Sequence, residues 1–212
     1  MRLPSPASPP PSPSVLPLPG AELLYWPCIG RDIDIADLFG RLREEIDWRQ
    51  ESITLFGKTH LQPRLICWMG DPGCSYRYSG KRWEPQGWHR LVAMLRDRVE
   101  RLAAARFNSV LLNYYRDGQD SMGYHADDEA ELGPRPIIAS LSLGAERIMH
   151  LRHRHDRSEP TRRIALADGS LLVMRGDMQA NWKHAIPKRR SATGPRINLT
   201  FRMIMGRAIS TA

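Results

Sequence analysis

From Phe107 onward the chain breaks into short runs of strand-forming residues separated by turn signals, and this pattern limits the possible folds more than any other feature. The turn signals are the glycine-containing dipeptides at 117–118, 133–134, 168–169 and 194–195. The runs around them predict strands at 107–115, 137–143, 146–153, 163–167, 170–175 and 197–205. So many short strands at close intervals are typical of a β-sandwich or a β-barrel.

Two segments of the N-terminal half have apolar residues at helical spacing. One lies between Asp34 and Trp48, and a longer amphipathic stretch runs from about Gln86 to Arg106. We expect both helices to cover one face of the β structure, which makes the fold class α+β. A chain of 212 residues is long enough for one domain with a sizeable core.

The first 20 residues differ from the rest of the chain because they are rich in Pro and Ser. This composition predicts an extended, mobile tail over residues 1–20, followed by a single domain over residues 21–212. No apolar run is long enough to cross a bilayer or to serve as a signal core, and the three cysteines lack CxxC spacing. We therefore expect no membrane contact and a reducing compartment, the cytoplasm or, in a eukaryote, the nucleus.

The chain is basic, with 31 Lys and Arg against 23 Asp and Glu and a net charge of +8. A surplus of this size favours polyanionic partners such as nucleic acids. The segment 152–163, RHRHDRSEPTRR, concentrates arginine between two predicted strands and is expected to grip phosphates. Neutralising Arg152, Arg154 and Arg157 should then lower the salt dependence of DNA binding. The simpler alternative is that the segment 152–163 is only an exposed hairpin tip.

Polar and apolar residues alternate strictly in RINLTFRM, residues 196–203. In a strand, such alternation places every polar side chain on one face. The polar residues are Arg196, Asn198, Thr200 and Arg202. Two guanidinium groups with an amide and a hydroxyl would make a good receptor for a dicarboxylate. In the predicted strand 107–115 the same alternation places Asn113 and Tyr115 on one side, as a second small polar cluster. A solvent-facing edge strand is the alternative for 196–203.

The segment GYHADDE, residues 123–129, contains His125 two positions before Asp127. Two imidazoles and one carboxylate on a single face are the ligands of non-haem Fe(II), which keeps its other positions open. In an extended segment both side chains point the same way, so a second histidine must come from another strand. His184, just after the predicted strand at 170–175, is the leading candidate.

Four segments together resemble one known family, the AlkB family of Fe(II)/2-oxoglutarate dioxygenases. They are NYYRDGQDSMGYHADDE, PIIASLSLGAER, GSLLVMRGDMQANWKHAIPK and PRINLTFR, which cover much of residues 107–203. The resemblance implies a double-stranded β-helix, or jelly-roll, core over about residues 107–205, with a nucleotide-recognition lid over about residues 50–85. It also implies Fe(II), 2-oxoglutarate and O2 as cofactor and cosubstrates.

The resemblance assigns roles to individual residues. It implies that His125, Asp127 and His184 hold the iron. It implies that 2-oxoglutarate is bound by Asn113, Tyr115, Arg196, Asn198, Thr200 and Arg202. The expected reaction is oxidative demethylation of N-alkylated bases of the 1-methyladenine and 3-methylcytosine type, which releases formaldehyde, succinate and CO2.

The same family pattern suggests how the substrate is recognised. The lid motifs LFGK and YRYSG resemble those of the branch that acts on double-stranded DNA, so Phe56 is expected to enter the duplex while Tyr76 and Tyr78 stack on the extruded base. Asp128 is expected to select the cationic alkylated base, with Glu129 as a second acid near it.

Three alternatives remain open on the residues alone. The chain could be a 2-oxoglutarate oxygenase that acts on RNA or protein rather than DNA. It could be a β-barrel that binds nucleic acid without catalysis, or it could hold a structural zinc ion, although thiolate ligands are missing. We expect a monomer that acts on alkylated DNA and favours double strands, with single-stranded DNA and RNA as further substrates.

Overall fold

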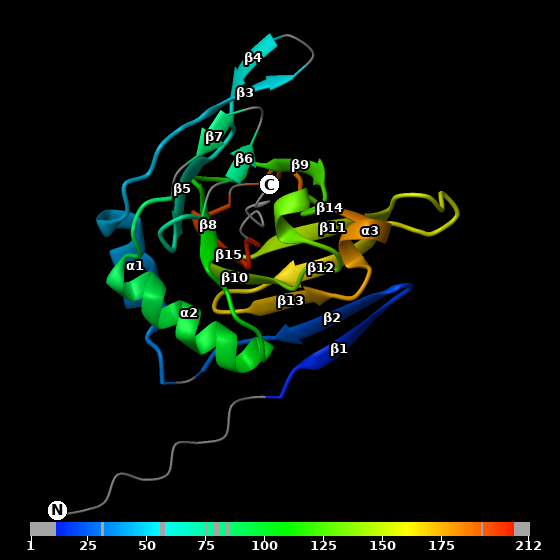
Figure 1. Ribbon diagram of the computed structural model, residues 1–212, viewed down its shortest axis with the longest axis horizontal. Helices are drawn as coiled ribbons and strands as arrows, with labels where there is room; N and C mark the ends of the chain where they lie inside the picture. Colours follow the sequence, from blue (N-terminus) through cyan, green and yellow to red (C-terminus); the bar gives the residue numbers. More distant parts are fainter. Residues whose placement is uncertain are drawn as a thin grey trace, which may run out of the picture.

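Two antiparallel β-sheets face each other in the computed structural model (Figure 1). It describes residues 12–30, 32–55, 58–74, 76–78, 81–83, 85–191 and 193–205, without the side chains of residues 53–58 and 75–84. The large sheet has seven strands in the order β1-β2-β13-β10-β15-β8-β5, and the small sheet has four in the order β12-β11-β14-β9. Two short hairpins, β3–β4 and β6–β7, lie apart from both sheets.

The strands of the large sheet come from both halves of the chain. They are β1 (Ser14–Leu18), β2 (Ala21–Trp26), β5 (Leu65–Gly70), β8 (Ser109–Tyr115), β10 (Ile138–Gly144), β13 (Leu171–Arg175) and β15 (Arg196–Arg202). The small sheet consists of β9 (Met122–His125), β11 (Arg147–His153), β12 (Arg162–Leu166) and β14 (Trp182–Ile186). The hairpins are β3 (Ser52–Leu55) with β4 (Lys58–Leu61) and β6 (Tyr76–Tyr78) with β7 (Lys81–Trp83).

From β8 onward the chain passes repeatedly between the two sheets. β8, β10, β13 and β15 belong to the large sheet, whereas β9, β11, β12 and β14 belong to the small one. This winding makes a double-stranded β-helix, or jelly roll, so the predicted β-sandwich and α+β class are confirmed. Two unpredicted strands, β9 and β14, carry two of the three candidate metal ligands, His125 and His184.

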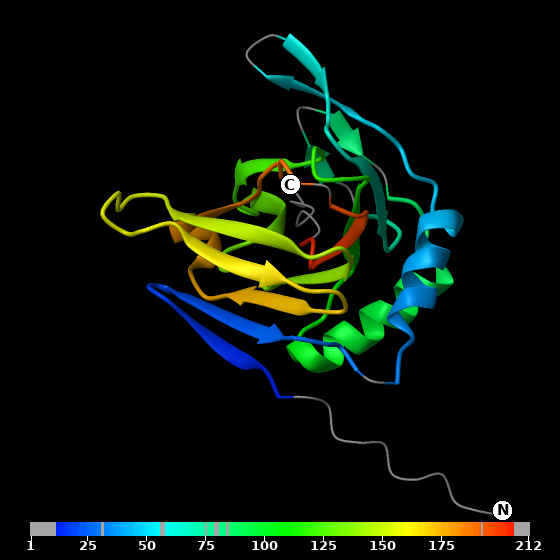
Figure 2. The ribbon, with the colours of Figure 1, turned by 180° about the vertical axis from the view of Figure 1, so that it is seen from behind.

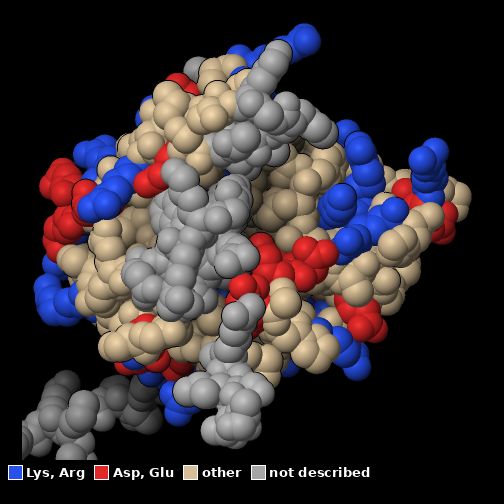
Figure 3. Space-filling view, turned by 45° about the horizontal axis from the view of Figure 1, so that its top comes forward, with Lys and Arg blue, Asp and Glu red and all other residues tan. Residues whose placement is uncertain are grey.

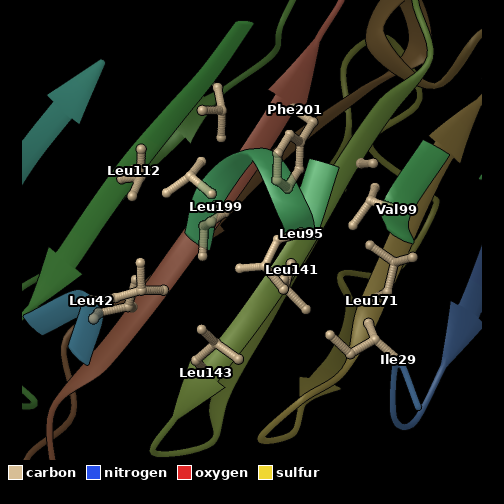
Figure 4. Packing of buried hydrophobic residues seen from close by; sticks show 14 of the residues in the cluster. Ile29, Leu42, Leu95, Val99, Leu112, Leu141, Leu143, Leu171, Leu199 and Phe201 are labelled. Atoms are coloured by element: carbon tan, nitrogen blue, oxygen red, sulfur yellow. The ribbon is translucent and has the colours of Figure 1, made fainter. Parts of the chain in front are cut away.

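Both helices pack on the outer face of the large sheet, as Figures 1 and 2 show. Helix α1 (Ile35–Glu45) begins where the Asp34 carboxylate accepts a hydrogen bond from the Asp37 backbone N–H at 3.0 Å, and it buries Leu38 and Leu42. Helix α2 (Arg90–Ala103) buries its apolar face against the same sheet. Figure 4 shows this layer, in which Leu95 and Val99 of α2 meet Leu141 and Leu199 of the sheet.

Helix α2 is shorter than the predicted range of 86–106. It starts four residues later because the Gln86 backbone is paired with strand β5, donating to the Trp68 carbonyl at 2.9 Å. It ends at Ala103 because Ala104 adopts a left-handed conformation with φ of 46°. The remaining short helical elements are η1 (Ala130–Leu132) and α3 (Met178–Asn181).

The predicted tail is wrong for residues 14–18. These residues form strand β1, which pairs with β2 at the edge of the large sheet, and Leu18 is buried in the layer between the sheets. Proline is tolerated at such an edge because its missing N–H faces away from the ladder. Among the described residues, no helix is long and apolar enough to cross a membrane.

Candidate active site

The structure brings His125, Asp127 and His184 together at the inner side of the small sheet. His125 ends β9, Asp127 follows it in the loop, and His184 lies opposite His125 in the adjacent strand β14. One potential ligand atom from each residue lies within 4.8 Å of the others, and the two imidazole ring centres are 4.2 Å apart. The expected convergence of these side chains is therefore present in the fold.

The charge states of the three groups suit metal binding. Burial disfavours the Asp127 carboxylate, but the charges of Arg202 and the two histidines outweigh burial and lower its pKa to about 2. Burial and the neighbouring His125 lower the pKa of His184 to about 3, and burial lowers the pKa of His125 as well. At neutral pH the cluster is therefore one carboxylate with two neutral imidazoles.

Two atoms of the cluster lack the partners that buried polar groups normally have. Among the described residues, neither Oδ2 of Asp127 nor Nδ1 of His184 has a hydrogen-bond partner. The other Asp127 oxygen accepts a hydrogen bond from Arg202 at 2.6 Å, and Nδ1 of His125 lies 2.9 Å from the Gly123 carbonyl. Nε2 of His184 lies 3.8 Å from the open Oδ2 of Asp127. A divalent cation between these two atoms would satisfy the open carboxylate oxygen, and this ligand set fits Fe(II).

An inner cavity extends from the cluster between the two sheets. Its predicted lining residues alternate along two adjacent strands of the large sheet: Asn113 and Tyr115 from β8, and Arg196, Asn198, Thr200 and Arg202 from β15. Because β15 lies in the middle of the sheet and its apolar residues pack under the helices, the alternative of a solvent-facing edge strand is wrong.

Arg196 is the most unusual group in this cavity, since its guanidinium is buried and only 1% of the residue is exposed. Its Nη2 donates to the Ser142 hydroxyl at 2.9 Å, but within the described part of the chain its Nε and Nη1 have no hydrogen-bond acceptor. Burial lowers its pKa to about 10, while Tyr115 works in the opposite direction, so the group stays cationic at neutral pH. A carboxylate of 2-oxoglutarate could accept hydrogen bonds from these two nitrogen atoms of Arg196.

Other polar groups of the inner cavity are already engaged with the protein. The Asn198 amide donates to the Ser140 hydroxyl at 2.8 Å and to the Leu141 carbonyl at 2.9 Å, and it accepts from Thr200 at 2.9 Å. These bonds hold the cavity wall rigid, which favours precise placement of a small ligand.

An outer cavity adjoins the inner one, and the two share the lining residues Leu111, Met122, His125, Asp127 and Arg202. Its walls are mostly apolar and come from β5 and the segment before it, from β8, from β9 and the loop after it, and from the end of β15 with the residues that follow. The apolar lining comprises Ile66, Trp68, Leu111, Met122 and Ile204. The metal cluster therefore lies where two cavities meet.

The three acids of GYHADDE have three different environments. Asp127 pairs with Arg202, and Asp128 is exposed and pairs with Arg154 at 2.6 Å, outside both cavities. Glu129 lines the outer cavity, and its Oε2 is buried without a hydrogen-bond partner in the described structure. Glu129 therefore lines the outer cavity beside the metal ligands, whereas Asp128 lines neither cavity.

Sequence reasoning missed two buried residues that support this site. Arg64, at 5% exposure, donates through Nε to the Asn113 side chain at 2.7 Å and lines the outer cavity. Gln179, on helix α3, accepts a hydrogen bond from the Asp127 backbone N–H at 2.9 Å. Both lie outside the strand alternation that identified the other residues, so no local sequence signal singled them out.

The predicted lid residues belong to the two hairpins β3–β4 and β6–β7 and the residues between their strands. Phe56 lies outside the described residues. Tyr76 and Tyr78 belong to strand β6, but their side chains lie outside the described part of the structure. The hairpins themselves project from the body beside the outer cavity's strand β5 (Figure 1).

The basic segment 152–163 spans the end of β11 and the start of β12. Figure 3 shows a cluster of Lys and Arg side chains at the right of the face, next to a central group of acidic side chains, while those at the left are mixed with acidic side chains. The Arg152 guanidinium stacks over the Tyr124 ring at 4.3 Å, and Arg154 is held by Asp128 and by the Gln179 carbonyl at 2.8 Å. This segment therefore connects a basic surface to the metal-binding loop.

The fold and the cluster define a class of enzyme. A family model described as the 2OG-Fe(II) oxygenase superfamily matches residues 25–202. Fe(II), 2-oxoglutarate and O2 are therefore the cofactor and cosubstrates, and the protein is an Fe(II)/2-oxoglutarate-dependent dioxygenase.

Two relatives narrow the class. Human DNA oxidative demethylase ALKBH2 is 37% identical over 195 residues, covering 88% of this chain and 74% of the relative. Bovine alpha-ketoglutarate-dependent dioxygenase alkB homolog 3 is 40% identical over 182 residues, covering 82% of this chain and 63% of the relative. The chain belongs to the AlkB family.

A solved structure, that of OsALKBH1, has a similar fold. It superimposes with a TM-score of 0.64 over 90% of this chain and all of that chain, at 16% sequence identity. This likeness supports the jelly-roll architecture alone.

Proposed function

We propose that this enzyme repairs DNA by oxidative demethylation of bases alkylated at a ring nitrogen, such as 1-methyladenine and 3-methylcytosine. The relatives named above, one of them a DNA oxidative demethylase, support this proposal. The observation that carries it is the position of Glu129, whose buried Oε2 has no hydrogen-bond partner among the described residues. Glu129 lines a mostly apolar cavity whose wall also contains the metal ligands His125 and Asp127.

In this proposal, His125, Asp127 and His184 hold Fe(II), and the inner cavity holds 2-oxoglutarate. Arg196 binds one carboxylate of the cosubstrate, with Tyr115 beside it, and Arg202 steadies Asp127 at the boundary of the two cavities. Asn113, Asn198 and Thr200 complete the polar wall. When bound, the iron with 2-oxoglutarate and O2 supplies the oxidation of the N-alkyl carbon, with succinate, CO2, formaldehyde and the restored base as products.

The outer cavity is proposed to receive the base after it has been extruded from the helix. A base alkylated at a ring nitrogen of adenine or cytosine is cationic, so an ionised Glu129 attracts it more strongly than the neutral parent base. The apolar walls exclude water and strengthen this attraction. Asp128 contributes less, because its charge is already balanced by Arg154.

DNA engagement is proposed to involve the lid and the basic segment 152–163. Phe56 would fill the space that the extruded base leaves, and Tyr76 and Tyr78 would stack on that base; these roles favour double-stranded DNA, with single strands and RNA as weaker substrates. Arg152 and Arg157 would bind backbone phosphates. The enzyme is proposed to act as a monomer in the cytoplasm, or in the nucleus of a eukaryote.

The proposal is tested by formaldehyde release from oligonucleotides that contain 1-methyladenine or 3-methylcytosine. Single-stranded DNA, duplex DNA and RNA are compared, with and without Fe(II) and 2-oxoglutarate, and methylated peptides form a further arm. We expect release from DNA only when both additions are present. Release from peptides alone would contradict the proposal, and a Phe56→Ala variant that loses duplex repair no more than single-strand repair would remove the lid role.

A further inference from the structure

Gln62 is a buried polar residue to which the reaction described above assigns no role. It lies between β4 and β5 and is 2% exposed. Its backbone is fixed, since its N–H donates to the Glu51 carbonyl at 2.8 Å and its carbonyl accepts from the Gln50 side chain at 2.9 Å. Its carboxamide, however, has no hydrogen-bond partner on either atom within the described structure.

The position of this carboxamide indicates what its partner is. Gln62 lines the outer cavity together with Glu129, whose Oε2 is also buried and without a partner among the described residues. Arg64 lines the same cavity, but its Nε–H already donates a hydrogen bond to the Asn113 side chain. Folded proteins rarely leave buried polar atoms without partners, and such atoms often bind a ligand or an ordered water.

We propose that Gln62 is a specificity-determining residue that reads the polar edge of the alkylated base, an inference that rests on the proposed function. The two orphaned groups differ in chemistry: an ionised Glu129 only accepts hydrogen bonds, whereas the carboxamide donates through Nε2 and accepts through Oε1. By turning about its last torsion, Gln62 can present either atom to the base.

This difference predicts which bases each residue serves. 1-Methyladenine is cationic and carries an amine beside the methylated nitrogen, so Glu129 can accept from it. 3-Methylthymine is neutral and carries only carbonyl oxygens there, which need a donor. Gln62 supplies that donor and thereby extends the substrate range to bases with a carbonyl edge.

The test compares kcat/KM for duplexes that contain 1-methyladenine or 3-methylthymine in the wild type and in Gln62→Met. Methionine keeps the length of the side chain but removes both hydrogen-bonding atoms. We expect activity on 3-methylthymine to fall at least about tenfold, the effect of one hydrogen bond in a dry cavity, and activity on 1-methyladenine to fall by less than about threefold. Gln119→Met, in an exposed glutamine outside both cavities, should change neither value.

A second measurement separates recognition from folding. Because the carboxamide has no hydrogen-bond partner among the described residues, Gln62→Met should not lower the Tm or change the KM for 2-oxoglutarate. Gln62→Asn, which shortens the side chain, should show the same selective loss on 3-methylthymine as Gln62→Met. Equal losses on both bases, no loss on either, or wild-type protein that acts on 1-methyladenine but not on 3-methylthymine would overturn the role of Gln62. Wild-type protein inactive on both bases would instead overturn the proposed function.

Discussion

The two cavities that meet at His125, Asp127 and His184 are built from different kinds of structure. The inner cavity is walled by alternate residues of β8, β10 and β15, and most of its polar groups are bonded to one another. The outer cavity draws Gln62 and Glu129 from connecting segments, and both carry buried atoms without partners in the described structure. The inner cavity is thus preorganised for one small ligand, whereas the outer one is completed only by its substrate.

This contrast has a functional reason. The cosubstrate is the same in every turnover, so a rigid receptor with one open guanidinium suits it. The base must enter and leave and can differ in chemistry, so part of its receptor lies on loops. A substitution in the inner cavity should therefore weaken 2-oxoglutarate binding without affecting the base, and a substitution in the outer cavity should do the reverse.

The largest effect is expected where the two cavities join. His184→Ala removes one of the three proposed metal ligands, so formaldehyde release should fall by more than about 100-fold. Residues that only support metal ligands typically cost about 10- to 100-fold when they are replaced. His150→Ala is the matched control, because His150 lies on the neighbouring strand outside both cavities. Retained activity in His184→Ala would place the metal elsewhere.

The next effect belongs to the inner cavity alone. Arg196→Met removes the charged donors that meet a carboxylate, so the Kd of 2-oxoglutarate should rise about 100-fold, which corresponds to about 3 kcal/mol for a buried charged hydrogen-bonding group. Binding of a methylated oligonucleotide, measured by fluorescence anisotropy, should not change. Equal weakening of both ligands would show that the two cavities are not independent.

A smaller effect is expected in the outer cavity. Glu129→Gln removes the charge that attracts a cationic base, and kcat/KM on 1-methyladenine duplexes should fall about tenfold or somewhat more while the KM for 2-oxoglutarate stays the same. Asp128→Asn is the matched control and should cost less than about threefold, because Asp128 is paired with Arg154 outside the cavity. The reverse ranking would restore Asp128 as the selecting acid.

The smallest effect concerns the basic segment 152–163. Replacing Arg152 and Arg157 by Gln should reduce the slope of log affinity against log salt by about 2, since each lost phosphate contact lowers it by about 1. Arg154 is left in place because it holds Asp128. The same replacements at Arg90 and Arg101 of helix α2, on the opposite side of the large sheet, should leave the slope unchanged.

The contrast between the cavities also explains what could be predicted from the sequence. Side chains alternate strictly along a strand, so the order of residues 196–202 is enough to place Arg196 and Asn198 on one face. The loop after β9 has no such period, so alternation could not show which of Asp128 and Glu129 lines a cavity; in the structure Glu129 does. Gln62 and Gln179 became visible only through contacts between segments far apart in the chain.

Composition was a weaker guide than alternation. The Pro-rich beginning of the chain predicted a tail through residue 20. Residues 14–18 instead form an edge strand, because they pair with the backbone of β2. The helix predicted from Gln86 starts only at Arg90 because the pairing of Gln86 with β5 takes precedence over helical propensity.

The most direct test of the joined cavities is the equilibrium binding of Mn(II), a stand-in for Fe(II), measured from the electron paramagnetic resonance signal of the free ion. We predict one Mn(II) per chain in the wild type, tighter Mn(II) binding when 2-oxoglutarate is added, no such tightening in Arg196→Met, and no site in Asp127→Ala. Mn(II) binding in Asp127→Ala that equals the wild type, or equal tightening by 2-oxoglutarate in Arg196→Met, would contradict the account.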